Sequence, residues 1–166
     1  MQFAMAFKII GVLLILFSTA MLPSLFISLI AKDGIESAFA TGLAATLLAG
    51  VLLWLPTRHL SRDLNIRDGF MVTALFWVVL GLFGAIPRWL TPDLPLTPAD
   101  AIFESISGLT TTGATVITGL DSLPQSLLFY RQLLQWLGGI GIIVLALSLI
   151  HISEPTRQAE ISYAVF

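Results

Sequence analysis

The sequence predicts an all-α integral membrane protein: two leading transmembrane helices, then a membrane helix, a re-entrant loop and another membrane helix. Its 166 residues are 57% hydrophobic and 11% charged, whereas a soluble domain carries about 25% charged residues. The mean hydropathy is +0.94. Four charge-free runs approach or exceed the roughly 20 apolar residues that a spanning helix needs. The chain therefore has too little polar surface to face water on all sides.

The composition also excludes several kinds of chemistry. The net charge of −2 argues against a nucleic-acid partner, which needs a basic surface. The chain has no cysteine, so a disulfide, a thiolate metal site and a thiol nucleophile are all excluded. His59 and His151 stand alone, whereas a zinc site needs clustered ligands. We therefore expect neither an enzyme nor a cofactor.

The first two spans form a leading unit over residues 1–57. The first charge-free run is Ile9–Ala31 and the second is Ser37–Thr57. The first run resembles a cleaved signal peptide, but the apolar region of such a peptide has only about 7–15 residues. We therefore expect this run to stay in the protein as a membrane anchor. Pro23 is expected to kink it, which neighbouring helices in a membrane can accommodate.

Two further spans follow, at Gly69–Pro87 and at residues 127–150, where the charge-free part is Gln132–Ile150. Between the second and third spans lies the connection 58–68, which carries three arginines. Lys and Arg concentrate in the cytoplasmic loops of membrane proteins. We therefore expect this connection and the N-terminus to be cytoplasmic.

With this orientation, the turn after the first span and the segment 88–131 lie outside. Asp33 and Glu36 in that turn are interpreted as ordinary solvated charges. Arg131 is interpreted as an interfacial anchor that reaches toward the headgroups, in preference to a charge on an ion pathway. Gly138 and its neighbouring glycines are interpreted as positions of close helix packing, because no strand precedes them as a dinucleotide-binding motif requires.

A short helix is predicted over residues 98–108, between the third and fourth spans. Thr97 suits the N-cap, Pro98 suits the first helical position, and Asp100 follows three residues after the cap. Gly108 suits the helix end. At 1.5 Å per residue, such a helix covers only about half of the hydrocarbon thickness. It can enter the membrane but cannot cross it.

The polar stretch GLTTTGATVI, Gly108–Ile117, follows this short helix. Irregular backbone at membrane depth is tolerated only where it is buried in protein or lines a water-filled cavity. The three adjacent threonines favour a cavity over the competing interpretation, small-residue packing on a membrane helix. The glycine of this stretch, Gly113, allows backbone angles that let consecutive carbonyls turn toward one axis.

Such a cavity favours cations, because the C-terminus of the short helix carries about −0.5 of a charge and points toward it. Asp100 and Glu104 lie four residues apart on one helix face, near the expected outer mouth, where they would concentrate cations. An acid/base pair is the other interpretation of these two carboxylates, but nothing nearby suggests a substrate pocket.

The stretch from Ile102 to Ile150, IFESISGLTTTGATVITGLDSLPQSLLFYRQLLQWLGGIGIIVLALSLI, resembles the membrane subunit of Trk-type potassium uptake proteins, in the Trk/Ktr/HKT superfamily. The resemblance covers roughly residues 1–150 and the N-terminal portion of the family. It implies four membrane helix–re-entrant pore loop–membrane helix repeats around one pore, with a two-helix unit before them. Residues 1–57 are then that unit, and residues 69–150 are the first pore repeat.

The same resemblance implies a selectivity filter for K⁺. Thr110, Thr111, Thr112, Gly113 and Ala114 match its first strand, with the carbonyls of Thr111 and Thr112 closest to the ion. The resemblance implies potassium uptake, by a channel or a symport mechanism that the sequence does not distinguish. It also implies a multi-pass protein of the bacterial inner membrane, with the lipid bilayer and a cytoplasmic nucleotide-binding regulatory subunit as partners.

Residues 151–166 do not align with the family. They are interpreted as a short cytoplasmic tail, or as unrelated sequence reached when the reading frame left the true gene. A single strand is about a quarter of a filter, so the remaining repeats or other copies must complete the pore. The alternative function is a truncated, non-conducting membrane fragment or an accessory membrane subunit.

Overall fold

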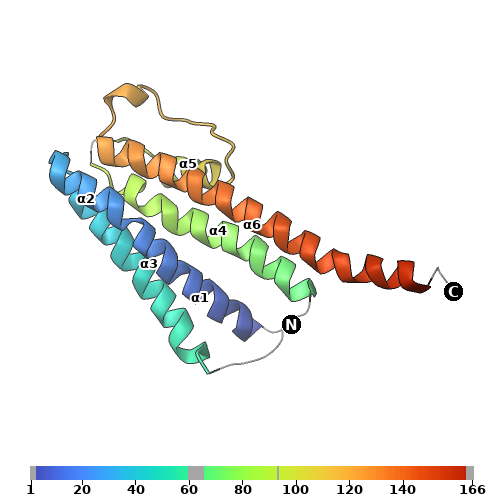
Figure 1. The fold of residues 1–166 in the computed structure, drawn as a ribbon. Helices are drawn as coiled ribbons and strands as arrows, with labels where there is room; N and C mark the ends of the chain where they lie inside the picture. The colour runs from blue at the N-terminus through green and yellow to red at the C-terminus, as the bar shows by residue number, and fades with distance from the viewer. Residues whose placement is uncertain (1–2, 60–65, 93, 164–166) are drawn as a thin grey trace.

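The computed structural model describes the backbone of residues 3–59, 66–92 and 94–163, and the side chains of 4–59, 72–92 and 94–144. These residues form α-helices and one 3₁₀ turn, with no strand among them, as the sequence predicts (Figure 1). The elements are α1 (Phe3–Ala20), α2 (Leu22–Ala31), α3 (Glu36–Thr57), α4 (Ile66–Trp89), α5 (Pro98–Leu109), η1 (Leu120–Ser122) and α6 (Gln125–Tyr163).

The predicted four spans are confirmed. Four apolar helical segments are long enough to cross a membrane: Ala4–Ala31, Glu36–Thr57, Val72–Trp89 and Gln125–Val144. Two boundaries differ from the sequence prediction. Helix α4 begins at Ile66, inside the expected connection 58–68, of which residues 60–65 lie outside the described part of the chain. Helix α6 continues to Tyr163, through most of the expected tail 151–166.

The first span is broken at Met21, between α1 and α2. The backbone N–H of Met21 donates to the Ser18 carbonyl at 3.1 Å, a bond across three residues in place of the α-helical four. Pro23 lies in the first turn of α2, where its missing N–H removes no intrahelical bond. The helix is thus interrupted just before Pro23, the residue at which the sequence predicts a kink.

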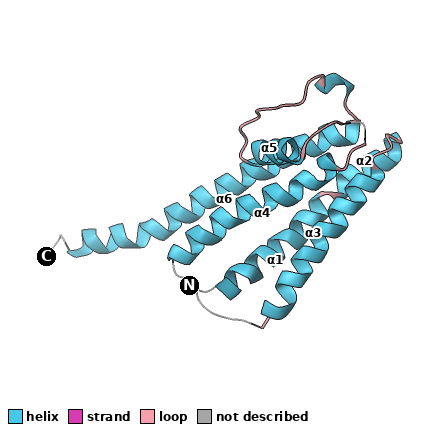
Figure 2. Ribbon diagram, turned by 180° about the vertical axis from the view of Figure 1, so that it is seen from behind, coloured by secondary structure: helices cyan, strands magenta, loops and turns pink. Residues whose placement is uncertain are grey.

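The leading unit is an antiparallel pair in which α1 packs along α3 (Figures 1 and 2). The two backbones meet at glycines: a Cβ added to Gly11 would lie 2.9 Å from the Gly50 carbonyl oxygen, and one added to Gly50 would lie 2.9 Å from that of Gly11. Small residues permit this approach, which is typical of membrane helices. Helices α4 and α6 complete the bundle beside this pair, and the short α5 packs against both of them.

Asp33 joins the leading unit to α6. Its carboxylate accepts hydrogen bonds from the Ser28 hydroxyl, from the Ser126 hydroxyl at 2.5 Å and from the Ser126 backbone N–H at 3.3 Å. Ser126 lies in the first turn of α6, where free N–H groups need acceptors. The expectation that Asp33 is an ordinary solvated charge is therefore wrong, because its partner lies 93 residues away in the sequence.

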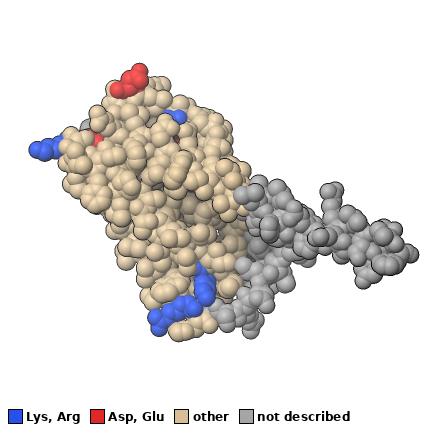
Figure 3. Space-filling model, in the orientation of Figure 1, with Lys and Arg blue, Asp and Glu red and all other residues tan. Residues whose placement is uncertain are grey.

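Charged side chains lie at the two ends of the bundle, and the band between them is almost free of charge on the face that Figure 3 draws. Basic groups gather at the end where α1 begins and α3 finishes, to which Lys8 and Arg58 belong. An uncharged band flanked by charged ends is the surface expected of helices that cross a bilayer.

Candidate functional site

The short helix α5 begins as the sequence predicts, with a capping box. The Asp100 backbone N–H donates to the Thr97 hydroxyl at 3.2 Å, and the Thr97 backbone N–H donates to the Asp100 carboxylate at 3.1 Å. Hydrogen bonds from the side chain and backbone of Thr97 hold the pKa of Asp100 below its usual value. The carboxylate of Asp100 therefore fixes the start of this helix.

The end of α5 differs in detail from the prediction. The helix continues through Gly108 to Leu109, and the left-handed residue after it is Thr111, with φ of +57°. Gly108 serves close packing instead, because a Cβ added there would lie 3.3 Å from the Leu134 side chain. A left-handed conformation at a β-branched residue costs about 1–3 kcal/mol and is typical of functional sites.

The C-terminal end of α5 rests directly on the backbone of α6. A Cβ added to Gly138 would lie 1.9 Å from the Leu109 carbonyl oxygen, a distance that no side chain tolerates. The prediction that Gly138 serves close helix packing is confirmed. This contact fixes where the polar stretch leaves the helix.

The candidate filter strand, residues 110–114, doubles back over the last turn of α5. The backbone N–H groups of Thr112 and Gly113 donate to the Ser107 carbonyl at 3.0 and 3.3 Å, and the Ser107 hydroxyl donates to the Ala114 carbonyl at 2.6 Å. Gly113 has φ of +73°, a left-handed conformation that glycine adopts readily, as the sequence predicts. One serine thus holds the second half of the strand, from Thr112 to Ala114.

Three consecutive carbonyls of this strand remain without a protein donor. Within the described part of the chain, no hydrogen bond is donated to the carbonyl oxygens of Thr110, Thr111 or Thr112. Two of the three side chains are occupied locally: the Thr110 hydroxyl donates to the Ile106 carbonyl at 2.8 Å and lies 2.9 Å from the Thr112 hydroxyl. All three threonines are exposed. Unbonded, exposed carbonyl oxygens are suitable ligands for a cation.

Glu104 does not lie at an exposed mouth, and that part of the prediction is wrong. Its side chain is 1% exposed and lies behind the strand. One carboxylate oxygen accepts from the Thr115 hydroxyl at 2.5 Å and from the Val116 backbone N–H at 2.7 Å. Asp100, half-buried at the helix start, makes none of these contacts. The two carboxylates therefore do not act as one cluster.

Arg131 is not an interfacial anchor, because its guanidinium points into the same network. One nitrogen donates to the Thr115 hydroxyl at 3.0 Å and lies 3.5 Å from the Glu104 carboxylate. The other donates to the Gly113 carbonyl at 3.4 Å. The sequence contains a sign of this position. Arg131 lies two helical turns before Gly138, so both residues are on the side of α6 that faces α5.

A second buried arginine was not singled out from the sequence. Arg88 lies near the end of α4, and its guanidinium carbon is 5.2 Å from the centre of the Tyr130 ring. Its two terminal nitrogens have no hydrogen-bond partner among the described residues. Stacking of a cation over an aromatic face accounts for part of its stabilisation.

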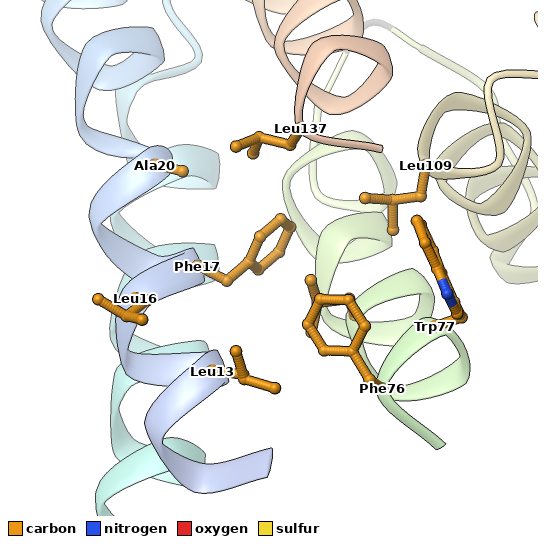
Figure 4. Close-up of a pocket in the computed structure, with 9 residues that line it drawn as sticks. Leu13, Leu16, Phe17, Ala20, Phe76, Trp77, Leu109 and Leu137 are labelled. Atoms are coloured by element: carbon orange, nitrogen blue, oxygen red, sulfur yellow. The ribbon is translucent and has the colours of Figure 1, made fainter. Parts of the chain in front are cut away.

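The described residues also line a half-open apolar pocket of about 170 Å³ between α1, α4 and α6, which reaches Leu109 at the end of α5 (Figure 4). Apart from the indole nitrogen of Trp77, the side chains around it are hydrocarbon. It therefore offers nothing that would bind an ion or a polar substrate. No group of three or more metal-ligating side chains occurs in the described part of the chain.

Comparison with known proteins identifies close relatives. The family model TrkH, described as a cation transport protein, matches residues 35–156 and so extends past Ile150. The Trk system potassium uptake protein TrkH of Halomonas elongata is 54% identical over 150 residues, covering 90% of this chain and 31% of the relative. TrkH of Escherichia coli K12 is 49% identical over 152 residues, covering 92% of this chain and 32% of the relative.

A solved structure also matches. The potassium transporter TrkH of Vibrio parahaemolyticus superposes with a TM-score of 0.84 at 49% identity, covering 90% of this chain and 32% of that one. The chain thus spans about a third of the length of the curated relatives and of the solved structure that it matches.

Proposed function

The chain belongs to the TrkH family of cation transport proteins, and from this premise we propose that it supplies one of the four strands of a potassium-selective filter. The ion passes through the inner membrane by permeation, without covalent chemistry. The protein is accordingly not an enzyme and needs no cofactor, and K⁺ is its transported ion.

The observation that carries this proposal is the row of unbonded carbonyls at Thr110, Thr111 and Thr112. Carbonyl oxygens that replace the hydration shell of K⁺ are the means by which potassium channels select this ion. The carbonyls of Thr111 and Thr112 contact the ion most directly, and Gly113 and Ala114 complete the strand. The C-terminus of α5 adds about −0.5 of a charge beside the strand, which favours a cation.

One strand supplies about a quarter of the coordinating oxygens, so the other three come from further repeats of the same polypeptide. The length of the relatives, about three times that of this chain, supports this arrangement. The second candidate concerns residues 1–166 by themselves: a non-conducting fragment or an accessory membrane subunit. Other copies of the chain are the remaining source of the missing strands.

The N-terminus and the connection after α3 face the cytoplasm in this proposal. Lys8 and Arg58 lie at that end of the bundle, and basic residues concentrate on the cytoplasmic side of membranes. The regulatory partner is the cytoplasmic nucleotide-binding subunit that the sequence resemblance implies.

A chimera tests the proposal. Residues 1–150 replace the corresponding segment of the full-length Escherichia coli relative, in cells that lack potassium uptake. We expect growth at limiting K⁺ with the chimera and no growth with residues 1–166 alone. A chimera that reaches the membrane but takes up no K⁺ would contradict the proposal, whereas rescue by residues 1–166 alone would favour assembly from copies.

A further inference from the structure

We propose that Glu104, Thr115 and Arg131 form a filter brace, a hydrogen-bonded unit around the buried Glu104 that fixes the orientation of the Gly113 peptide and thereby sets the ion preference of the strand. This inference deepens the proposed function and rests on it. Glu104 and Arg131 are positioning residues here, because they act on the ion only through the backbone.

The need for a brace follows from where the support given by α5 ends. Ser107 bonds to Thr112, Gly113 and Ala114, and it reaches no further along the strand. Beyond Ala114, the backbone is held through the brace: Glu104 accepts from the N–H of Val116, and the Thr115 hydroxyl accepts from the N–H of Ile117 at 3.1 Å. The strand also contains a strained residue at Thr111, so it does not keep this shape by local preference.

The three members of the brace satisfy one another. The Thr115 hydroxyl donates its single proton to Glu104 and accepts from Arg131, so its donor and acceptor capacities are both used. The second carboxylate oxygen of Glu104 faces the same Arg131 nitrogen at 3.5 Å. With exposed fractions of 1% for Glu104 and 11% for Arg131, the ion pair is shielded from water. Removing either charge leaves the other buried without compensation.

The contact that matters for ion selection is the one from Arg131 to the Gly113 carbonyl, at 3.4 Å. This carbonyl directly follows the three unbonded ones. A guanidinium that holds it draws it toward α6 and away from the row at Thr110–Thr112. Glycine offers little resistance to rotation of its peptide plane. Without Arg131, the Gly113 carbonyl is free to turn, and the spacing of the neighbouring oxygens changes with it.

A purely structural role for the ion pair predicts something different. If the pair only held the fold, its loss would lower the amount of protein in the membrane, and the surviving molecules would keep their ion preference. The filter brace predicts a changed ratio of K⁺ to Na⁺ uptake per molecule. The ratio therefore separates the two roles.

Arg131→Lys is the sharpest variant. A lysine keeps the positive charge beside Glu104, but its single nitrogen does not reproduce the fork that reaches Thr115 and Gly113 together. We expect normal membrane levels and a K⁺-to-Na⁺ uptake ratio lowered about tenfold, the scale of one lost charge-assisted hydrogen bond. Arg131→Gln and Glu104→Gln should lower the ratio at least as far.

Because the three residues form one unit, the double variant Glu104→Gln/Arg131→Gln should not lower the K⁺-to-Na⁺ uptake ratio further than Arg131→Gln alone does. Asp121→Asn is the matched control, since it removes an exposed carboxylate from the segment after the strand without touching the brace. Its uptake ratio should equal that of the parent.

The experiment uses the full-length chimera reconstituted in vesicles, with K⁺ and Na⁺ uptake measured per molecule. An unchanged ratio in Arg131→Lys and Glu104→Gln, with a selective parent, overturns the filter brace and leaves the proposed function standing. A parent chimera that does not prefer K⁺ overturns the proposed function, and the role of the brace with it. A lowered ratio in both variants and an unchanged control support the inference.

Discussion

In the proposed function the polar stretch after α5 acts through its backbone, and two residues shape that backbone. Thr111 and Gly113 lie in the left-handed region, with φ of +57° and +73°. The carbonyls of Thr110, Thr111 and Thr112 have no protein donor in the described part of the chain. The hydroxyls of Thr110 and Thr112 bond locally, so these two side chains support the backbone.

Gly113→Ala tests the role of the backbone. The nearest atom to an added Cβ is 3.7 Å away, so the substitution meets no steric clash and acts only through the positive φ. The strain of about 1 kcal/mol should shift the peptide and lower the K⁺-to-Na⁺ uptake ratio of the chimera several-fold. Gly119→Ala is the control, because Gly119 has φ of +72° but lies outside the strand. Equal ratios for both variants would contradict the filter assignment.

At the scale of elements, the site depends on contact between α5 and α6. The end of α5 rests on Gly138, and Arg131 reaches the strand from the same side of α6. Neither helix positions the strand alone: α5 supplies Ser107 and Glu104, and α6 supplies the guanidinium. A change that separates the two helices should therefore affect both stability and ion preference.

Gly138→Ala separates the helices, and Gly139→Ala is its matched control. The new methyl group at Gly138 overlaps the Leu109 carbonyl, whereas at Gly139 the nearest atom is 4.0 Å away. Overpacking of this kind costs about 1–3 kcal/mol or more. In thermal unfolding of the 166-residue chain in detergent, Gly138→Ala should lower the Tm by several degrees, at about 2–4 °C per kcal/mol. Similar Tm values for the two variants would show that the predicted overlap is absent.

The elements themselves were predictable where local sequence determines them. The four spans follow from length and hydropathy, and the start of α5 follows from the spacing of Thr97, Pro98 and Asp100. The partners of Glu104 were not predictable in this way. Arg131 and Val116 come from later segments that meet Glu104 only in the folded chain. A carboxylate four residues after Asp100 therefore looked like a second surface charge.

For the whole molecule, helices α1 to α3 pack against α4 and α6 as one body. Beyond their apolar contacts, Asp33 in the turn between α2 and α3 accepts from Ser126 in the first turn of α6. Burial raises the pKa of Asp33, but hydrogen bonds from Ser126 and Ser28 outweigh this effect and hold the pKa below its ordinary value. This pairing was not predictable from the sequence, because a solvated turn is the usual place for an aspartate.

The pH dependence of the protein's stability follows from the lowered pKa of Asp33. A carboxyl whose pKa is lower in the folded state stabilises the protein above its unfolded pKa and loses that contribution as the pH falls through the folded pKa. The chain should therefore lose stability below about pH 4, and Asp33→Asn should lose less over the same range. The difference should stay below about 1 kcal/mol, because the site is partly exposed to water.

Denaturant unfolding in detergent between about pH 6 and pH 3 measures this effect, since the interval brackets the ordinary pKa of aspartate. Asp121→Asn, which removes an exposed carboxylate that accepts no hydrogen bond in the described structure, is the control for the substitution itself. If Asp33→Asn follows the parent, Asp33 does not link the leading unit to α6 in the way described.

The central claim is that the strand 110–114 binds K⁺ through the backbone, and the most direct measurement is to locate the ion. Crystals of the full-length chimera grown with Rb⁺, which replaces K⁺ and scatters anomalously, should give a peak in contact with the carbonyl oxygens of Thr111 and Thr112. Gly113→Ala should weaken or displace that peak. Rb⁺ density that is absent from this strand but present elsewhere along the pathway would contradict the account.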